Sequence, residues 1–399
     1  MTFLLPFGEM TMTPDDAKQI IGLALEGKVV FEGFNNFIPF EELFFLAKYF
    51  LGWEKLEAEE EFEIGGGAMP KDKRSFSVPG ERLETINMTR KINMVRLREK
   101  FEDSGSKTVS GKVVMDRARS RHTSISYLLH SLGTVFFPDF SGNKVNACYL
   151  QWLKTLSLDP ETNEVPRYSW GTALLASVME NLCKASRWNI TQIIGCVARI
   201  QNWALEKPTG GRYPFRGTQH KAKEMEMVDM RKKLDALTID DVVFDPYLKL
   251  DEDGEDEVGD RVFSDVATYV GPLFHSTGFI ILDPRRTLRQ IGNVQRILPE
   301  DSRFKLSVDN SQFKDKNVRL TYEPAPSIDH WNARSEGVNQ ISRRALETSH
   351  GTSVADENYM EWYQDLSHPY VENLDPEARK HFKKGESLKS RTSRNEESD

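Results

Sequence analysis

Apolar residues recur every three or four positions along much of the chain, which is the spacing of helices that bury one side. Residues 13–16, Thr-Pro-Asp-Asp, predict a helix start, because a capping hydroxyl, a first-turn proline and two acids suit the positive end of a helix dipole. The same periodicity predicts helices over residues 40–53, 124–137, 145–156, 170–186 and 191–206. Helices are densest between residues 122 and 206, which is therefore the expected centre of the fold.

One short segment has the pattern of a strand instead. Residues 279–282, Phe-Ile-Ile-Leu, are continuously apolar and are bounded by Gly278 and Pro284. Segments rich in glycine, proline or charge interrupt the helical pattern, and they predict surface loops over residues 56–80, 103–112, 207–223 and 251–260.

The composition supports one large folded unit. Of the 399 residues, 39% are hydrophobic and 10% are aromatic, which is enough to bury a sizeable core. After Tyr370 the chain carries few apolar side chains to offset its ordering entropy. We therefore predict a mainly α fold, a single multi-helical globular domain over residues 1–370 with a few short β-strands, followed by a disordered charged tail over residues 371–399.

Charge and cysteine content narrow the class of protein. The net charge of -8 provides no global positive field for nucleic acid or an anionic membrane, so any such contact needs a local patch. The three cysteines are odd in number and lack CxxC spacing, as in a reduced intracellular protein. No run approaches the roughly 20 apolar residues that a membrane span needs. We expect a soluble protein of the nucleus or cytoplasm.

A short basic helix is predicted after the strand candidate. Asp283 can cap it, Pro284 takes its first position and Gly292 ends it. The arginines in or after this helix are Arg285, Arg286, Arg289 and Arg296. Arg285 and Arg289 are four positions apart and share one helix side, where guanidinium groups can hold a phosphate or carboxylate. The alternative, which we favour, is a structural ion pair with a buried acid.

The loop over residues 207–223 is the second candidate for anion binding. Its arginines Arg212 and Arg216 alternate with Tyr213 and Phe215. Basic side chains can follow a phosphate backbone while aromatic rings stack on unpaired bases. A solvated basic loop with two anchoring aromatic residues has the same sequence pattern, and the acidic character of the whole chain favours it.

No pattern of catalytic residues is evident. The eight histidines show neither HExxH nor close pairing with cysteine, no GxSxG is present, and Gly105 to Lys112 does not have P-loop spacing. A site assembled from distant residues would leave little trace in the sequence. We expect no catalytic residues, no metal, no cofactor and no small-molecule substrate.

Several segments in fixed order resemble the plant mobile domain, also called the aminotransferase-like domain, of MAINTENANCE OF MERISTEMS-like proteins and some plant transposable elements. They include Phe7-Gly8-Glu9-Met10-Thr11, Tyr168-Ser169-Trp170-Gly171, Ile194-Gly195-Cys196, Gln201-Asn202-Trp203 and Glu361-Trp362-Tyr363. The residues that match the family motifs are Gly8, Glu9, Trp170, Gly195, Trp203, Gln290, Gly292 and Gln295. The likeness covers residues 3–370. Trp170 and Trp203 are expected in the core, with a partner-binding groove as the alternative.

The resemblance implies a non-catalytic nuclear protein that acts as an interaction scaffold in meristem maintenance, transposon silencing and gene-expression control. It implies a PP7-type serine/threonine phosphatase as a protein partner, and it favours the basic residues 379–384 as a nuclear import signal. The family usually carries further helical sequence before the segment that begins at Phe3, so the resemblance implies a shortened N-terminus. A transposon-derived nucleic-acid-binding module is the alternative function.

Overall fold

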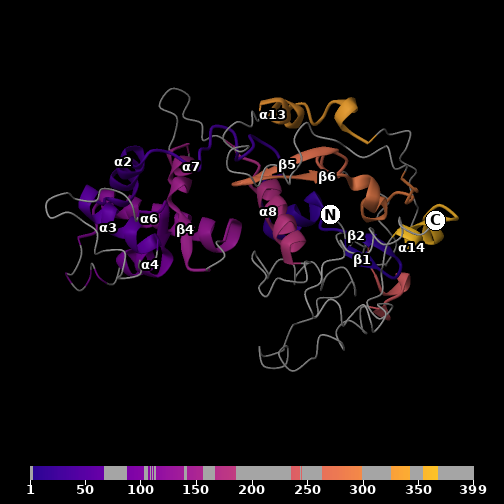
Figure 1. Ribbon diagram of the computed structural model, residues 1–399, viewed down its shortest axis with the longest axis horizontal. Helices are drawn as coiled ribbons and strands as arrows, with labels where there is room; N and C mark the ends of the chain where they lie inside the picture. The colour runs from indigo at the N-terminus through magenta and orange to yellow at the C-terminus, as the bar shows by residue number, and fades with distance from the viewer. Residues whose placement is uncertain are drawn as a thin grey trace, which may run out of the picture.

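The computed structural model confirms a mainly helical fold with a few short strands (Figure 1). It describes residues 3–66, 88–102, 107, 109, 111, 114–138, 142–155, 167–185, 235–242, 244, 263–298, 325–341 and 354–366. The predicted helix over residues 191–206, the loops over 207–223 and 251–260 and the tail after residue 370 lie outside the described residues.

The helices α1 (Pro14–Ile21), α2 (Phe40–Leu51) and α8 (Trp170–Ala185) confirm the predicted helices at these places. At the start of α1 the Thr13 hydroxyl accepts a hydrogen bond from the Asp16 amide at 3.1 Å, and the Asp16 carboxylate accepts one from the Thr13 amide at 2.8 Å. This reciprocal cap is the device that residues 13–16 predicted.

The predicted loop over residues 56–80 is wrong in its first part, because α3 spans Lys55–Gly66. Its acidic surface masks a buried side formed by Ala58 and Phe62, which are fully buried. Glu61 lies between them and is paired with Arg96 and Lys100, each at 2.8 Å. Burial alone raises the pKa of Glu61, but the hydrogen bonds from the two cations hold this pKa below its ordinary value.

Two predicted helices have different boundaries. The predicted helix over residues 124–137 is α6 (Arg117–Ser131) followed by a π-helical turn, η2 (Leu132–Phe136). The predicted helix over residues 145–156 is a strand, β4 (Lys144–Asn146), then a 3-10 turn, η3 (Ala147–Tyr149), and α7 (Leu150–Thr155). The Asn146 side chain accepts a hydrogen bond from the Cys148 amide at 3.0 Å, so the helical run starts only after the strand.

Three antiparallel strand pairs provide the described strands, and the first and last of them are hairpins. They pair β1 (Phe3–Leu5) with β2 (Gly8–Met10), β3 (Lys91–Asn93) with β4, and β5 (Gly271–His275) with β6 (Gly278–Leu282). The last of these contains the strand predicted over residues 279–282, with Leu273 opposite Ile280. The remaining described helices are α4 (Met94–Phe101), η4 (Ile239–Asp241), η5 (Pro284–Ile291), α13 (Ala325–Asn332), η8 (Gly337–Asn339) and α14 (Tyr359–Leu366).

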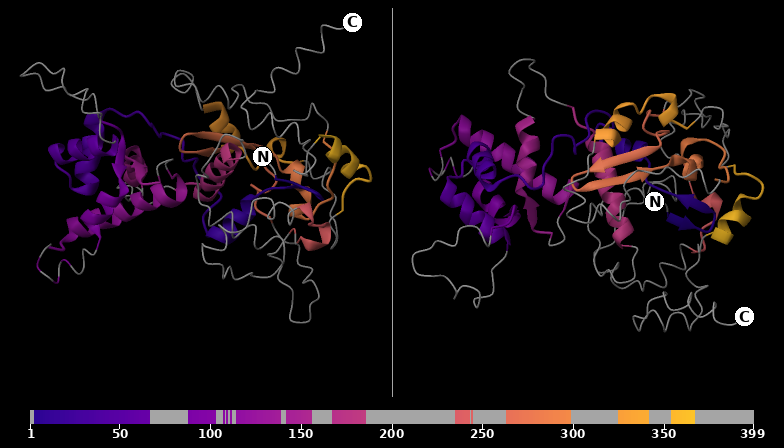
Figure 2. Two further views of the ribbon diagram at one scale, coloured as in Figure 1. Left: turned by 60° about the horizontal axis from the view of Figure 1, so that its bottom comes forward. Right: turned by 45° about the horizontal axis from the view of Figure 1, so that its top comes forward.

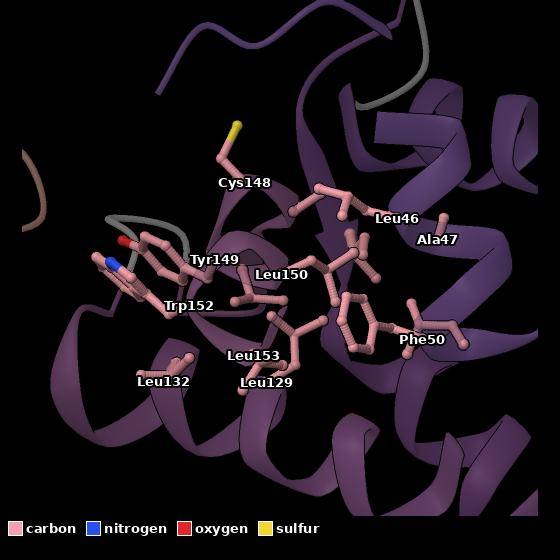
Figure 3. Close-up of a cluster of buried hydrophobic side chains, with 14 of the residues drawn as sticks. Leu46, Ala47, Phe50, Leu129, Leu132, Cys148, Tyr149, Leu150, Trp152 and Leu153 are labelled. Carbon is pink, nitrogen blue, oxygen red and sulfur yellow. The ribbon is translucent and has the colours of Figure 1, made fainter. Parts of the chain in front are cut away.

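Buried apolar side chains form two main clusters, which lie on the two sides of the molecule in Figure 2. The first is built by α2, α3, α4, α6 and α7, and in it Leu150 and Leu153 point toward Leu129 and Phe50 (Figure 3). The second is built by the β1–β2 and β5–β6 hairpins, α1, α8 and α13. Phe136 packs against both clusters. The domain boundary at residue 370 stays a prediction.

Candidate functional site

The family-like motifs at the two ends of the chain meet at one place, which we call the hairpin junction. It comprises the β1–β2 hairpin, η5 with the turn through Gln295, and α14, whose Tyr363 bonds to the hairpin backbone. In Figure 1 these elements lie together, with the indigo hairpin beside the orange η5 and the yellow α14. Residues more than 270 positions apart in the sequence therefore share one site.

Helix η5 is less regular than predicted. It is a 3-10 helix in which Thr287 has non-helical angles of φ -139° and ψ 39°. The predicted ends are confirmed, since the Asp283 side chain accepts from the Arg285 amide and Gly292 ends the helix at φ 72°. Arg285 and Arg289, which were expected to share one side, bind different partners.

Three of the four predicted arginines are paired with carboxylates. Arg285 donates to Asp283 at 2.6 and 2.7 Å, and Arg296 donates to Asp356 at 2.7 Å. Arg286 donates through both its Nε and a terminal nitrogen to the two oxygens of Glu9, whose side chain is 7% exposed. The bond to Glu9 raises the pKa of Arg286, and the bond to Asp283 raises that of Arg285. These contacts favour the structural alternative; anion binding stays a prediction.

The fourth, Arg289, is buried and carries no carboxylate partner among the described residues. It donates to the Phe7 carbonyl at 2.9 Å, and its guanidinium lies 5.0 Å from the Tyr359 ring centre and 5.9 Å from that of Phe244. Its Nε has no hydrogen-bond partner in the described part of the chain. Burial lowers its pKa, so aromatic faces and one carbonyl are what stabilise this cation.

The motif glutamines tie backbone segments together. Gln290 accepts from the Thr11 amide at 2.7 Å and donates to the Thr11 carbonyl at 2.8 Å. Gln295 accepts from the Leu288 amide at 2.9 Å and donates to the Arg285 carbonyl at 2.9 Å. Both side chains are 2% exposed. Each amide therefore satisfies a donor and an acceptor that water cannot reach.

We predict that Gln290→Leu destabilises the fold by about 2 kcal/mol, because it removes two buried hydrogen bonds between this side chain and the Thr11 backbone. Gln151→Leu is the matched control, since Gln151 also accepts from the amide and donates to the carbonyl of one residue, Asn35, but these bonds are exposed to solvent. Urea unfolding measures both variants, and equal losses of unfolding free energy would contradict the prediction.

Sequence reasoning missed the aromatic contribution of α14. Tyr359 and Tyr363 stack in parallel with ring centres 6.0 Å apart, and Tyr363 donates to the carbonyls of Leu5 and Gly8 at 3.0 and 3.3 Å. Gly8 has φ 131°, and a Cβ there would lie 3.3 Å from the Tyr359 ring. The four-residue spacing of the two tyrosines was the available signal.

The other predicted site residues are not at this junction. Trp170 begins α8, is partly buried, and packs edge-on against Trp152 with ring centres 5.4 Å apart. Gly195, Trp203, Arg212 and Arg216 lie outside the described residues.

Of the described cysteines, Cys148 is buried and Cys183 is exposed. Cys148 is a free cysteine whose burial raises its pKa to about 11, which keeps the thiol protonated at neutral pH. Among the described residues, no group of three His, Cys, Asp or Glu side chains could hold a metal ion. Nor is any helix in that part of the chain both long and apolar enough to cross a membrane.

One buried histidine lies between α8 and the β5–β6 turn. His275 is 2% exposed, and its Nε2 lies 3.3 Å from the Glu180 carboxylate, which also pairs with Lys184 at 3.0 Å. Burial lowers the pKa of His275 to about 4 against the opposing effect of Glu180. In the folded protein the His275 imidazole is therefore neutral at neutral pH.

This burial predicts acid sensitivity with a defined sign. Below pH 6.5 the unfolded chain protonates His275 while the folded chain does not until about pH 4, so stability present above pH 6.5 is lost as pH falls from 6.5 toward 4. The loss amounts to at most about 3 kcal/mol. His275→Gln should flatten the pH dependence of the unfolding free energy in this window. Because other histidines titrate there too, the difference between the two proteins is the measured quantity, and identical slopes would refute the assignment.

Comparison with known proteins identifies the family of this chain. The family model of the plant mobile domain matches residues 75–364. The chain belongs to the plant mobile domain family. It is similar to Protein MAIN-LIKE 1 of Arabidopsis thaliana, 23% identical over 92% of this chain and 63% of that protein, and to Protein MAINTENANCE OF MERISTEMS of the same plant, 23% identical over 92% of this chain and 67% of that protein. This plant mobile domain chain thus spans just under two thirds of the length of MAIN-LIKE 1.

A further relative is named as a phosphatase homologue. A "Serine/threonine-protein phosphatase 7 long form homolog" of Arabidopsis thaliana is 26% identical over 228 residues, which are 57% of this chain and 14% of that protein. The plant mobile domain likeness is therefore found in a segment of a phosphatase homologue as well. No solved structure shows a significant match to this chain.

Proposed function

We propose that this chain is a non-catalytic nuclear interaction scaffold that acts in meristem maintenance, transposon silencing and gene-expression control. The observation that carries the proposal is the likeness to Protein MAINTENANCE OF MERISTEMS over 92% of the chain. The hairpin junction supports it, because its arginines and glutamines hold the chain together instead of converging on an open substrate site.

A PP7-type serine/threonine phosphatase is the proposed partner. The phosphatase 7 long form homologue matches this chain over only 14% of its own length. A domain that resembles this chain therefore occurs within a longer phosphatase homologue. We infer that the separate chain meets a related phosphatase as a protein partner.

Affinity purification from plant nuclei tests this proposal. The tagged full chain is expected to recover a PP7-type phosphatase, and an unrelated nuclear protein with the same tag is the control. Binding is then repeated with the two purified proteins. Recovery at the level of the control, or no binding between the purified proteins, would count against the partner.

The proposed nuclear location has its own test. Replacing Lys383 and Lys384 by alanine in a fluorescently tagged chain is expected to reduce its nuclear accumulation in plant cells, because the basic run of residues 379–384 loses half of its lysine and arginine charge. Cytoplasmic fluorescence of the unaltered chain would contradict a nuclear location.

A nucleic-acid-binding module is the second candidate, supported by the basic sequence of residues 207–223. The carboxylates on Arg285, Arg286 and Arg296 weigh against η5 as the binding element. Gel shifts of DNA and RNA over a salt series distinguish the candidates, since phosphate contacts weaken steeply with salt. Absence of any shift at low salt excludes the module.

A further inference from the structure

An exposed aromatic surface lies on α2 and α6, on the side of the molecule away from the hairpin junction (Figure 1). Phe45 is 63% exposed and Tyr49 is 48% exposed, although both are large aromatic residues. Their rings lie parallel within 6°, with centres 6.2 Å apart. Together with the exposed charges that flank them, Glu41, Glu42, Arg117 and Arg121, they form what we call the α2–α6 face.

Contacts within the chain fix the Tyr49 side chain of the α2–α6 face in the absence of a partner. The Arg121 guanidinium lies 4.3 Å from the Tyr49 ring centre, and the Tyr49 ring meets the buried Phe50 edge-on at 4.9 Å. At the end of α2, the His122 ring lies 2.7 Å from the point that a Cβ of Gly52 would occupy. A fixed surface loses little side-chain freedom on binding.

Its charges are arranged with opposite signs at the two ends. Glu41, Phe45 and Tyr49 lie on successive turns of α2. The distance from Glu41 to Tyr49 along the helix axis is about 12 Å. Arg121 covers the Tyr49 end, and Arg117 lies one turn before it on α6. The order along the face is therefore acidic, aromatic and basic.

We propose that the α2–α6 face is a self-association surface whose occupant is a second copy of this chain. A two-fold axis across the aromatic centre places Glu41 and Glu42 of each copy opposite Arg117 and Arg121 of the other. Self-complementarity of this kind is what a two-fold dimer requires. The two carboxylates repel phosphate, so this face fits a protein better than a nucleic acid. The inference is independent of the proposed scaffold function.

Two adjacent helix faces make a small interface, so association is expected in the micromolar range, not tighter. Analytical ultracentrifugation of the full chain over a concentration series is expected to show a reversible monomer–dimer equilibrium. Phe45→Glu should raise the dimer dissociation constant by about tenfold or more, because it places a charge at the aromatic centre. Val338→Glu is the matched control, since Val338 is 85% exposed on η8, outside this face.

Charge exchange gives a second test. A misfolded variant would not regain association when it is mixed with its counterpart. Glu41→Lys with Glu42→Lys makes both ends of the face basic, and Arg117→Glu with Arg121→Glu makes both ends acidic. Each variant alone should be monomeric, because its own copies repel, whereas an equimolar mixture should form a heterodimer. Thermal unfolding confirms that each is folded; if loss of the Arg121 stacking unfolds the second, Arg117→Glu alone replaces it.

A chain that stays monomeric to millimolar concentration overturns the proposal. So does a dimer that Phe45→Glu leaves unchanged, or a mixture of exchanged variants that fails to associate. A monomer that instead retards single-stranded DNA through Tyr49 also overturns it, and would assign the face to nucleic acid.

Discussion

Replacing Trp152 by alanine is expected to lower the unfolding free energy by about 4 kcal/mol, the loss typical of a large aromatic side chain removed from a packed core. Trp152 is 2% exposed. Its ring stacks on Phe34 and Tyr149 with ring centres 4.2 and 4.8 Å away, and Figure 3 shows the Tyr149 and Trp152 rings lying together. The variant therefore removes the partner of several rings at once.

The indole nitrogen adds a second contribution. It donates to the carbonyl of the fully buried Val30 at 2.8 Å. Trp152→Phe keeps an aromatic ring but leaves this carbonyl without its donor, so it should lose roughly half as much as the alanine variant. Urea unfolding curves of both variants check the order. A phenylalanine variant as unstable as the alanine variant would show that the hydrogen bond, not the ring packing, dominates.

Replacing Gly27 by alanine should destabilise the fold by a similar amount, about 4 kcal/mol, from backbone strain and overpacking together. Gly27 has φ 120°, and a Cβ there would lie 2.4 Å from the Arg167 carbonyl oxygen. The two backbones approach this closely because Lys28 donates to Arg167 and Ser169 donates to Lys28, each at 2.9 Å. A methyl group cannot enter without breaking that pairing.

Gly22 is the control for this prediction. It ends α1 at φ 70°, and a Cβ there meets nothing within 4 Å. Gly22→Ala therefore adds only the conformational cost of a left-handed residue, about 1 kcal/mol. Thermal unfolding measures both variants. If their losses are equal, the close approach of Arg167 is not what makes Gly27 necessary.

Local patterns in the sequence predicted several elements correctly. Residues 13–16 predicted the cap of α1, and the short apolar run at residues 279–282 predicted β6, because caps and short apolar strands depend on neighbouring residues. The acidic surface of α3 concealed its buried side, which depends on Arg96 and Lys100 from α4. The three-residue strands of the first two strand pairs were too short to show alternation.

Sequence alone determined the mainly helical class, because that class depends on composition and periodicity. The family resemblance was carried by the motif segments and their fixed order along the chain. Only the tertiary structure decided what the motif residues do. Glu9 and Arg286 are 277 positions apart, as Thr11 and Gln290 are 279 apart, and no local pattern shows which distant side chain will neutralise a charge or satisfy a buried amide. That choice is made when burial removes water and each polar group must find a partner within the protein.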